Sequence, residues 1–230
     1  TMLARQLQLS EEQVREAALG GLLHDMGKAT LPLEVLNKPG KLTEEEFAIV
    51  RQHPVHGERL LRDGGITQEA ILHIARHHHE KFNGAGYPQR LSGAELPLLT
   101  RMSAICDVYD AITSNRPYKA GWDPAESLRR MAGWQGHFDE TLLKAFVRSV
   151  GIYPIGALVR LSSDRLAVVV EQNPATLLAP RVRVFYSAKS RTHLLMTDVD
   201  LASAGDRERI VSVESPATWG FRELEKLWLP

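Results

Sequence analysis

The hydrophobic periodicity of the chain changes at Gly151, and this change constrains the fold more than any other feature. Before it, apolar residues recur three and four positions apart, which is the spacing of one helix face. After it, short β-branched segments alternate with turn residues at 158–161, 166–171, 181–186 and 194–199. We therefore expect a mainly α protein: a helical bundle over residues 1–150 and a small antiparallel β-rich appendage over 151–230.

Capping signals place several of the helices. Ser10-Glu-Glu-Gln13 and Thr43-Glu-Glu-Glu46 have the spacing of a capping box, so a helix should begin after Ser10 and another after Thr43. The first should run to His24, and the second should continue past Pro54 with a kink beside His53. Further helices are expected from residue 67, over 99–113, after the cap Asp139, and over 219–228.

The charge balance and cysteine content exclude several classes of protein. Lys plus Arg and Asp plus Glu both number 28, and a net charge of zero argues against a general binder of nucleic-acid polymers or anionic membranes. The single cysteine, Cys106, excludes an internal disulfide and fits a reducing compartment. No apolar run approaches the roughly 18 residues that span a bilayer, so we expect a cytoplasmic protein without a membrane segment. Because the chain opens on Thr1, we expect a piece of a longer protein.

His24 and Asp25 form a pair at the expected end of the first helix. Adjacent side chains on a helix point about 100° apart, so the two could converge on one site only where the helix stops. Gly27 is expected to take the left-handed conformation of a C-terminal cap and turn the chain away. An imidazole nitrogen and a carboxylate are common transition-metal ligands, and an aspartate can bridge two ions through its two oxygens.

Three other predicted helices carry side chains of the same kinds on or beside their apolar faces. They contribute His53, the pair His78 and His79, and Asp107. Separate, individually satisfied polar groups are the simpler alternative for each one. Buried imidazoles and carboxylates need partners, however, so four helices that all deliver such groups inward predict a site for two or more metal ions. The other histidines are expected outside the ligand set, at the surface or in structural roles: His56, His73, His77, His137 and His193.

Three motifs together resemble the HD-GYP domain. They are HDMGK at 24–28, HHEKFNGAGYP at 78–88 and DVYDAITSNRPY at 107–118. The resemblance covers roughly residues 1–150 and implies an HD-domain helical bundle, the fold of a metal-dependent phosphohydrolase family. It also implies a bacterial phosphodiesterase that hydrolyses the second messenger cyclic di-GMP to linear pGpG, with GMP left open as a further product.

The same resemblance implies roles for individual residues. Two divalent metal ions are expected, with a third left open, and a histidine-rich ligand set with carboxylates suits Fe or Mn, with Zn as an alternative. Asp25 would bridge the ions and, with Lys28, act in catalysis. Tyr87 and Tyr118 are candidates to contact the guanine. The phosphate contacts would be Lys28, Arg116 and Lys119, although a solvated basic loop is the simpler reading of the last two. The metal ligands would be His24, Asp25, His53, His78, His79 and Asp107.

The chain also departs from the pattern of that family. Its members usually carry another histidine ligand on a helix about thirty residues upstream of the His-Asp pair, and no histidine precedes His24. We therefore expect the upstream part of the domain to be missing here. The family often has a glycine where Arg90 stands, so the loop around 84–90 is expected to differ locally.

Two other functions remain open. The chain could be a catalytically weak module that binds cyclic di-GMP or a partner, such as a diguanylate cyclase (GGDEF) domain held through the loop at 84–88. It could also hydrolyse a hybrid cyclic GMP-AMP dinucleotide. A homodimer is left open.

Overall fold

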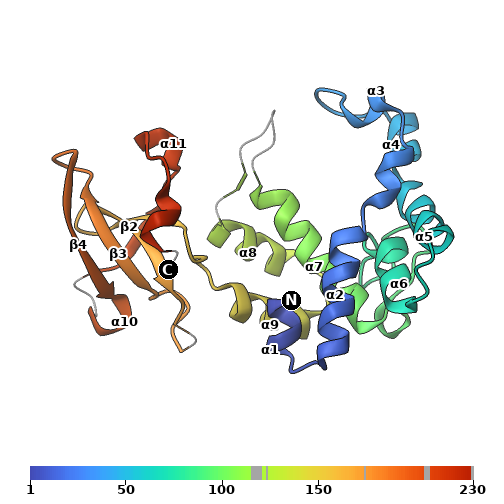
Figure 1. The fold of residues 1–230 in the computed structure, drawn as a ribbon, viewed down its shortest axis with the longest axis horizontal. Helices are drawn as coiled ribbons and strands as arrows, with labels where there is room; N and C mark the ends of the chain where they lie inside the picture. Colours follow the sequence, from blue (N-terminus) through green and yellow to red (C-terminus); the bar gives the residue numbers. More distant parts are fainter. Residues whose placement is uncertain (115–120, 123, 174, 205–207, 229–230) are drawn as a thin grey trace. The chain divides into compact units, whose positions relative to one another are not determined.

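A computed structural model describes residues 1–114, 121–122, 124–173, 175–204 and 208–228, and it divides the chain into two compact units (Figure 1). The first unit, Thr1–Trp122 with Glu126–Ser149, is helical. The second, Asp123–Ala125 with Val150–Pro230, contains the sheet. Helices followed by a small antiparallel sheet confirm the fold class expected from the change of periodicity at Gly151.

Short and medium-length helices build the chain up to Val150, and the expected caps lie at their starts. Ser10 Oγ accepts the backbone N–H of Gln13 at 3.2 Å, and Thr43 Oγ1 accepts that of Glu46 at 3.2 Å. The helices are α1 (Met2–Gln6), α2 (Glu11–Leu23), η1 (Met26–Thr30), α3 (Leu33–Leu36), α4 (Glu44–Val50), α5 (His53–Asp63), α6 (Glu69–His77), η2 (Gly93–Glu95), α7 (Leu98–Thr113), α8 (Pro124–Gly133) and α9 (Glu140–Val150).

The expected kinked helix around Pro54 is two separate helices. α4 ends at Val50, and α5 begins at His53 with Pro54 in its first turn. Proline has no N–H to donate to the carbonyl four residues earlier, so the α-helical ladder cannot continue through this point. Proline is well suited to the first turn of a helix, where that N–H has no partner in any case. The prediction of a single continuous helix was therefore wrong.

Close backbone contacts at glycines bring the metal-ligand candidates together. A Cβ at Gly27 would lie 1.8 Å from the carbonyl oxygen of His53 and 2.6 Å from the nitrogen of Gly57, so η1 and α5 touch through their backbones. A Cβ at Gly20 would lie 2.4 Å from Ile74 Cδ1, which puts α2 directly against α6. The end of α2 is thereby fixed beside both helices.

Gly27 does not adopt the left-handed conformation that we expected. It lies inside the 3-10 helix η1 and is absent from the residues with positive φ. Its lack of a side chain serves the packing of η1 on α5, because even a methyl group would collide with the α5 backbone. The chain therefore turns after Asp25 through a tighter helix.

The second unit is a five-stranded sheet in the order β4-β3-β2-β1-β5, with each neighbouring pair antiparallel. The short strand β5 was not predicted, because Ile-Val-Ser-Val offers only four residues and a polar side chain among them. Its strands are β1 (Leu158–Leu161), β2 (Arg165–Glu171), β3 (Arg181–Ser187), β4 (Thr192–Asp200) and β5 (Ile210–Val213).

Apolar side chains cover both faces of this sheet. In β2, Ala167 and Val169 belong to one buried cluster, while Leu166 and Val168 belong to another, as a two-residue period requires. α10 (Leu201–Ala204) contributes to the first cluster and the C-terminal segment to the second. That segment comprises α11 (Pro216–Trp219) and η4 (Leu224–Leu227) instead of one helix over 219–228, because Gly220 turns left-handed at φ +70°. Within the described residues, no helix combines the length and apolar character needed to cross a membrane.

Candidate metal centre

Three histidines at helix ends present the same ring nitrogen to one site. His53 Nδ1 lies 2.7 Å from the carbonyl oxygen of Val50, His78 Nδ1 lies 3.0 Å from that of Ala75, and His24 Nδ1 lies 2.7 Å from that of Gly21. A carbonyl oxygen can only accept, so Nδ1 carries the hydrogen in each ring. Each Nε2 is therefore available as a ligand, with its orientation fixed by the hydrogen bond on the other side of the ring.

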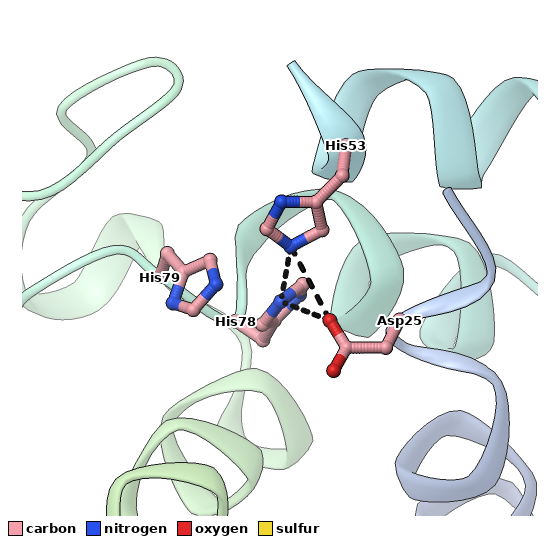
Figure 2. A group of neighbouring side chains, drawn as sticks. All are labelled: Asp25, His53, His78 and His79. Atoms are coloured by element: carbon pink, nitrogen blue, oxygen red, sulfur yellow. Dashed lines mark hydrogen bonds and ion pairs between the residues drawn. The ribbon is translucent and has the colours of Figure 1, made fainter. Parts of the chain in front are cut away.

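The first donor set contains Asp25, His53, His78 and His79, whose ligand atoms lie within 4.8 Å of one another (Figure 2). Asp25 Oδ1 is 3.3 Å from His53 Nε2 and 3.6 Å from His78 Nε2. The two Nε2 atoms face each other at 3.2 Å. Two imidazole ligands bound at about 2.1 Å to one ion lie about 3.0–3.4 Å apart, so this spacing fits a shared cation.

The second donor set contains His24, Asp25 and Asp107. His24 Nε2 lies 3.3 Å from Asp25 Oδ2 and 3.5 Å from Asp107 Oδ1. The other oxygen of Asp107 is 3.8 Å from His79 Nδ1, which connects the two sets. Asp25 belongs to both, with Oδ1 toward His53 and His78 and Oδ2 toward His24.

The electrostatics of the cluster favour a cation. Burial lowers the pKa of His24, but the carboxylates of Asp107 and Asp25 outweigh burial and raise it to about 10. For Asp25, burial raises the pKa, while the surrounding imidazoles and Lys28 hold it far below its usual range. His24 Nε2 and Asp25 Oδ1 are buried without a hydrogen-bond partner. Buried ligand atoms without a hydrogen-bond partner fit a divalent ion, and the cluster could bind metal.

The residues expected to contact substrate are placed only in part. Lys28 Nζ lies 2.5 Å from Asp25 Oδ2, at the edge of the cluster. The ring of Tyr87 stacks on that of His79 with centroids 4.9 Å apart. Arg116, Tyr118 and Lys119 lie outside the described residues.

The remaining histidines lie outside both donor sets. His77 is buried beside Glu80, and burial lowers its pKa to about 4. His56 Nδ1 pairs with Thr30 Oγ1 at 2.9 Å. The ring of His73 contacts that of His77 in a tilted arrangement, and His137 stacks against Trp134 and Phe138.

Two residues beside the site were missed by the sequence analysis. The Arg51 guanidinium lies over the rings of Phe47 and Tyr87, and the buried carboxylate of Glu80 accepts the N–H of Gln89 at 2.7 Å. The four-residue spacing of Phe47 and Arg51 in the sequence was the available signal for the contact between these two residues. The contact of Arg51 with Tyr87 has no such signal, because the two residues lie far apart in the sequence. For Glu80, its position directly after His78 and His79 was the available signal in the sequence.

Comparison with known proteins gives consistent matches. A family model described as HD domain matches residues 1–142. The chain is 54% identical over 98% of its length to a cyclic di-GMP phosphodiesterase of Pseudomonas aeruginosa, and covers 55% of that protein. It is 43% identical over 64% of its length to the cyclic di-GMP phosphodiesterase response regulator RpfG of Xanthomonas campestris, covering 39% of it. A 3′3′-cGAMP-specific phosphodiesterase of Vibrio cholerae is 36% identical over 64% of this chain, which covers 34% of that enzyme.

The fold has a solved counterpart. An HDG"Y"P protein from Bdellovibrio bacteriovorus superposes with a TM-score of 0.52 and 23% identity, over 62% of this chain and 46% of that one. The present chain therefore spans about half the length, or less, of the relatives that it matches.

Proposed function

The chain belongs to the HD-domain family, and on that premise we propose that it is a metal-dependent phosphodiesterase that hydrolyses cyclic di-GMP. The observation that carries the proposal is the pair of donor sets that share Asp25. The names of the Pseudomonas and Xanthomonas relatives support the substrate. The product is linear pGpG, which a second hydrolysis would convert to GMP.

The donor sets suggest the metal content. Two divalent ions fit the two donor sets best. One would lie beside His53, His78 and His79 and the other beside His24 and Asp107, with Asp25 common to both. The described residues do not form a donor set for a third ion. A set of several imidazoles together with carboxylates suits Fe or Mn, and Zn is the alternative. Ions bound there supply Lewis-acid charge to a phosphoryl oxygen and lower the pKa of water.

The protein's own groups bind and orient the diester. Asp25 would fix the position of the two donor sets relative to each other, because each of its carboxylate oxygens faces a different set. Lys28 pairs with Asp25 and would offset negative charge on the phosphoryl group. Arg116 and Lys119 are proposed as further phosphate contacts, and Tyr87 and Tyr118 as surfaces for guanine.

The wider context of the site is proposed on the same premise. Residues 1–150 would form the HD-GYP phosphodiesterase domain and residues 151–230 a C-terminal extension. The loop at 84–88 would be the contact surface for diguanylate cyclase (GGDEF) domains. A second-messenger enzyme of this kind would act in the bacterial cytoplasm, where its substrate is made. Association into a homodimer would be measured by light scattering.

Chromatography of cyclic di-GMP after incubation with the chain tests the function. The chain is reconstituted anaerobically with Fe(II) or Mn(II), and a pGpG peak is expected. The peak should be lost in Asp25→Asn and retained in Asp63→Asn, a matched change at an exposed aspartate of α5 that pairs with Arg59. Binding of cyclic di-GMP without formation of product would favour a signalling module that does not hydrolyse it. Equal rates of hydrolysis for Asp25→Asn and Asp63→Asn would reject the catalytic role of Asp25.

A hybrid cyclic GMP-AMP dinucleotide is the second candidate substrate. Vibrio cholerae relatives named as 3′3′-cGAMP-specific are 36–39% identical to this chain over roughly half to two thirds of its length, which favours testing it. The two dinucleotides share a backbone and differ in one base, so rates measured side by side on the same preparation would decide. We expect cyclic di-GMP to be hydrolysed faster.

A further inference from the structure

Arg51 is a cation in contact with two aromatic rings, and one of them, Tyr87, stacks on the metal-ligand candidate His79. It is the C-terminal cap residue of α4, and its guanidinium carbon lies 4.5 Å from the centroid of the Phe47 ring and 5.5 Å from that of the Tyr87 ring. Cation–π contacts of this kind restrain the guanidinium without using its N–H donors, which can still bind an anion. Among the described residues, no carboxylate oxygen lies within ion-pair distance of Arg51.

Arg51 and Arg90 line one hollow of about 530 Å³ on the surface. The rest of the lining of this hollow is the segment from Gly84 to Pro88. None of these lining residues is acidic. Arg90 has no carboxylate partner within the described part of the chain either, and its backbone lies in the left-handed region at φ +59°. Two unpaired arginines in a hollow without an acid make a site for an anion.

The loop that forms this hollow is fixed before any ligand arrives. The N–H of Ala85 donates to Asn83 Oδ1 at 3.0 Å, that of Tyr87 to the His79 carbonyl at 3.3 Å, and that of Gln89 to Glu80 Oε1 at 2.7 Å. Gly86 lies so close to the preceding segment that a Cβ there would be 2.4 Å from the nitrogen of Lys81. A preorganised anion site loses little ordering entropy on binding.

The hollow shares lining residues with a depression that reaches two of the metal-ligand candidates. Arg51 and Tyr87 also line a second depression of about 290 Å³, whose lining includes His78 and His79. The Tyr87 ring lies between the two, near Arg51 and stacked on His79. A ligand held by Arg51 would therefore lie beside the depression that His78 and His79 of the first donor set line.

We propose that Arg51 and Arg90 form a subsite for the second, non-reacting phosphate of the substrate. This inference rests on the proposed function, because it assumes that the reacting phosphate lies at the metal centre. The subsite selects for nucleotides that carry two phosphates across a short span, as cyclic dinucleotides do. A diester with a single phosphate gains nothing from it.

The test compares two substrates on the full chain loaded with Mn(II). Cyclic di-GMP carries two phosphates, and bis(p-nitrophenyl) phosphate carries one. Charged hydrogen bonds to phosphate correspond to roughly 10- to 100-fold in affinity. In Arg51→Ala and in Arg90→Gly, the ratio of kcat/KM for cyclic di-GMP to that for bis(p-nitrophenyl) phosphate should fall by about that factor, mainly through KM. Arg59→Ala removes an exposed arginine that pairs with Asp63 away from the hollow, and should leave the ratio unchanged.

Inhibition of bis(p-nitrophenyl) phosphate hydrolysis by cyclic di-GMP separates this inference from the proposed function. If cyclic di-GMP inhibits the wild type without being hydrolysed, and inhibits Arg51→Ala far more weakly, the proposed function fails and the subsite stands. If cyclic di-GMP is hydrolysed but the ratio survives both arginine substitutions, the function stands and the subsite is wrong. Absence of both hydrolysis and inhibition in an active wild type overturns both.

Discussion

The ring of His53 donates from Nδ1 to the carbonyl oxygen of Val50, 2.7 Å away, in the place where a helical N–H would otherwise bind. The residue four positions after Val50 is Pro54, which has no N–H to donate. The proline therefore separates α4 from α5 and leaves a free acceptor, which orients the imidazole. The break in the helix and the availability of His53 Nε2 have the same cause.

Replacing Pro54 with alanine should weaken metal binding. The new N–H competes with His53 for the Val50 carbonyl, and the loss of such an orienting contact typically lowers metal affinity by roughly 10-fold or more. Mn(II) titration of the metal-free chain measures the change. Pro216→Ala is the matched control, because Pro216 likewise lies in the first turn of a helix but belongs to the other unit. Equal affinities in the two variants would contradict this account of His53.

Gly27 and Gly21 should respond in opposite ways to alanine. At Gly27 the added methyl meets the backbone of α5, so overpacking should cost roughly 1–3 kcal/mol and displace Asp25 from His53. At Gly21 a Cβ meets nothing within 4 Å, and alanine in this exposed helical position should stabilise by up to about 1 kcal/mol. Unfolding of the two variants in denaturant measures the change in the free energy of unfolding, which should fall for Gly27→Ala and rise for Gly21→Ala. A Gly27→Ala chain as stable as the wild type would show that η1 can move away from α5 freely.

The sequence predicts much of this arrangement because the relevant signals are local. Capping boxes at Ser10 and Thr43 satisfy the first N–H groups of their helices wherever those helices pack, so the helix starts were predicted correctly. The apolar faces of α6 and α7 likewise follow from spacing alone. They place His78 and Asp107 beside the core, and the structure brings both within reach of Asp25 or His24.

The features that the sequence did not predict depend on contacts between segments that are distant in sequence. Gly27 resembles a helix-ending glycine until α5 is known to lie against it, and only the packed structure explains its conformation. Arg51 could be placed over Phe47 from helical spacing, but its contact with Tyr87 requires the loop to return to α4. β5 depends on pairing with β1, about fifty residues away, and its own four residues carry little signal.

Glu80 should hold the loop at 84–90 in place. Its side chain is fully buried, and Oε1 accepts the Gln89 N–H at 2.7 Å. Leaving a buried N–H without its hydrogen-bond partner costs roughly 1–3 kcal/mol, so Glu80→Ala should lower the exchange protection of the Gln89 amide by about 10- to 100-fold. Hydrogen exchange with mass spectrometry reads this directly. The exposed Glu140→Ala is the control, and unchanged protection in Glu80→Ala would reject the role.

The sheet should be far more sensitive to truncation in its core than at its edge. Leu166 is fully buried in β2, so Leu166→Ala should cost roughly 2–5 kcal/mol in the free energy of unfolding. Leu195 in the edge strand β4 is 90% exposed, and Leu195→Ala should change that free energy by less than about 0.5 kcal/mol. Chemical denaturation followed by circular dichroism distinguishes the two. A large loss at Leu195 would mean that β4 is covered by another surface in solution.

The stoichiometry of Mn(II) binding tests the central claim most directly, because the claim is that one aspartate serves two donor sets. The metal-free chain is titrated with Mn(II) under anaerobic conditions, and bound metal is counted per chain. We predict two ions for the wild type, weakened binding of both in Asp25→Asn, and loss of one ion with retention of the other in His53→Ala. A wild type that binds a single ion, or an Asp25→Asn variant that binds two as tightly as before, would contradict the account.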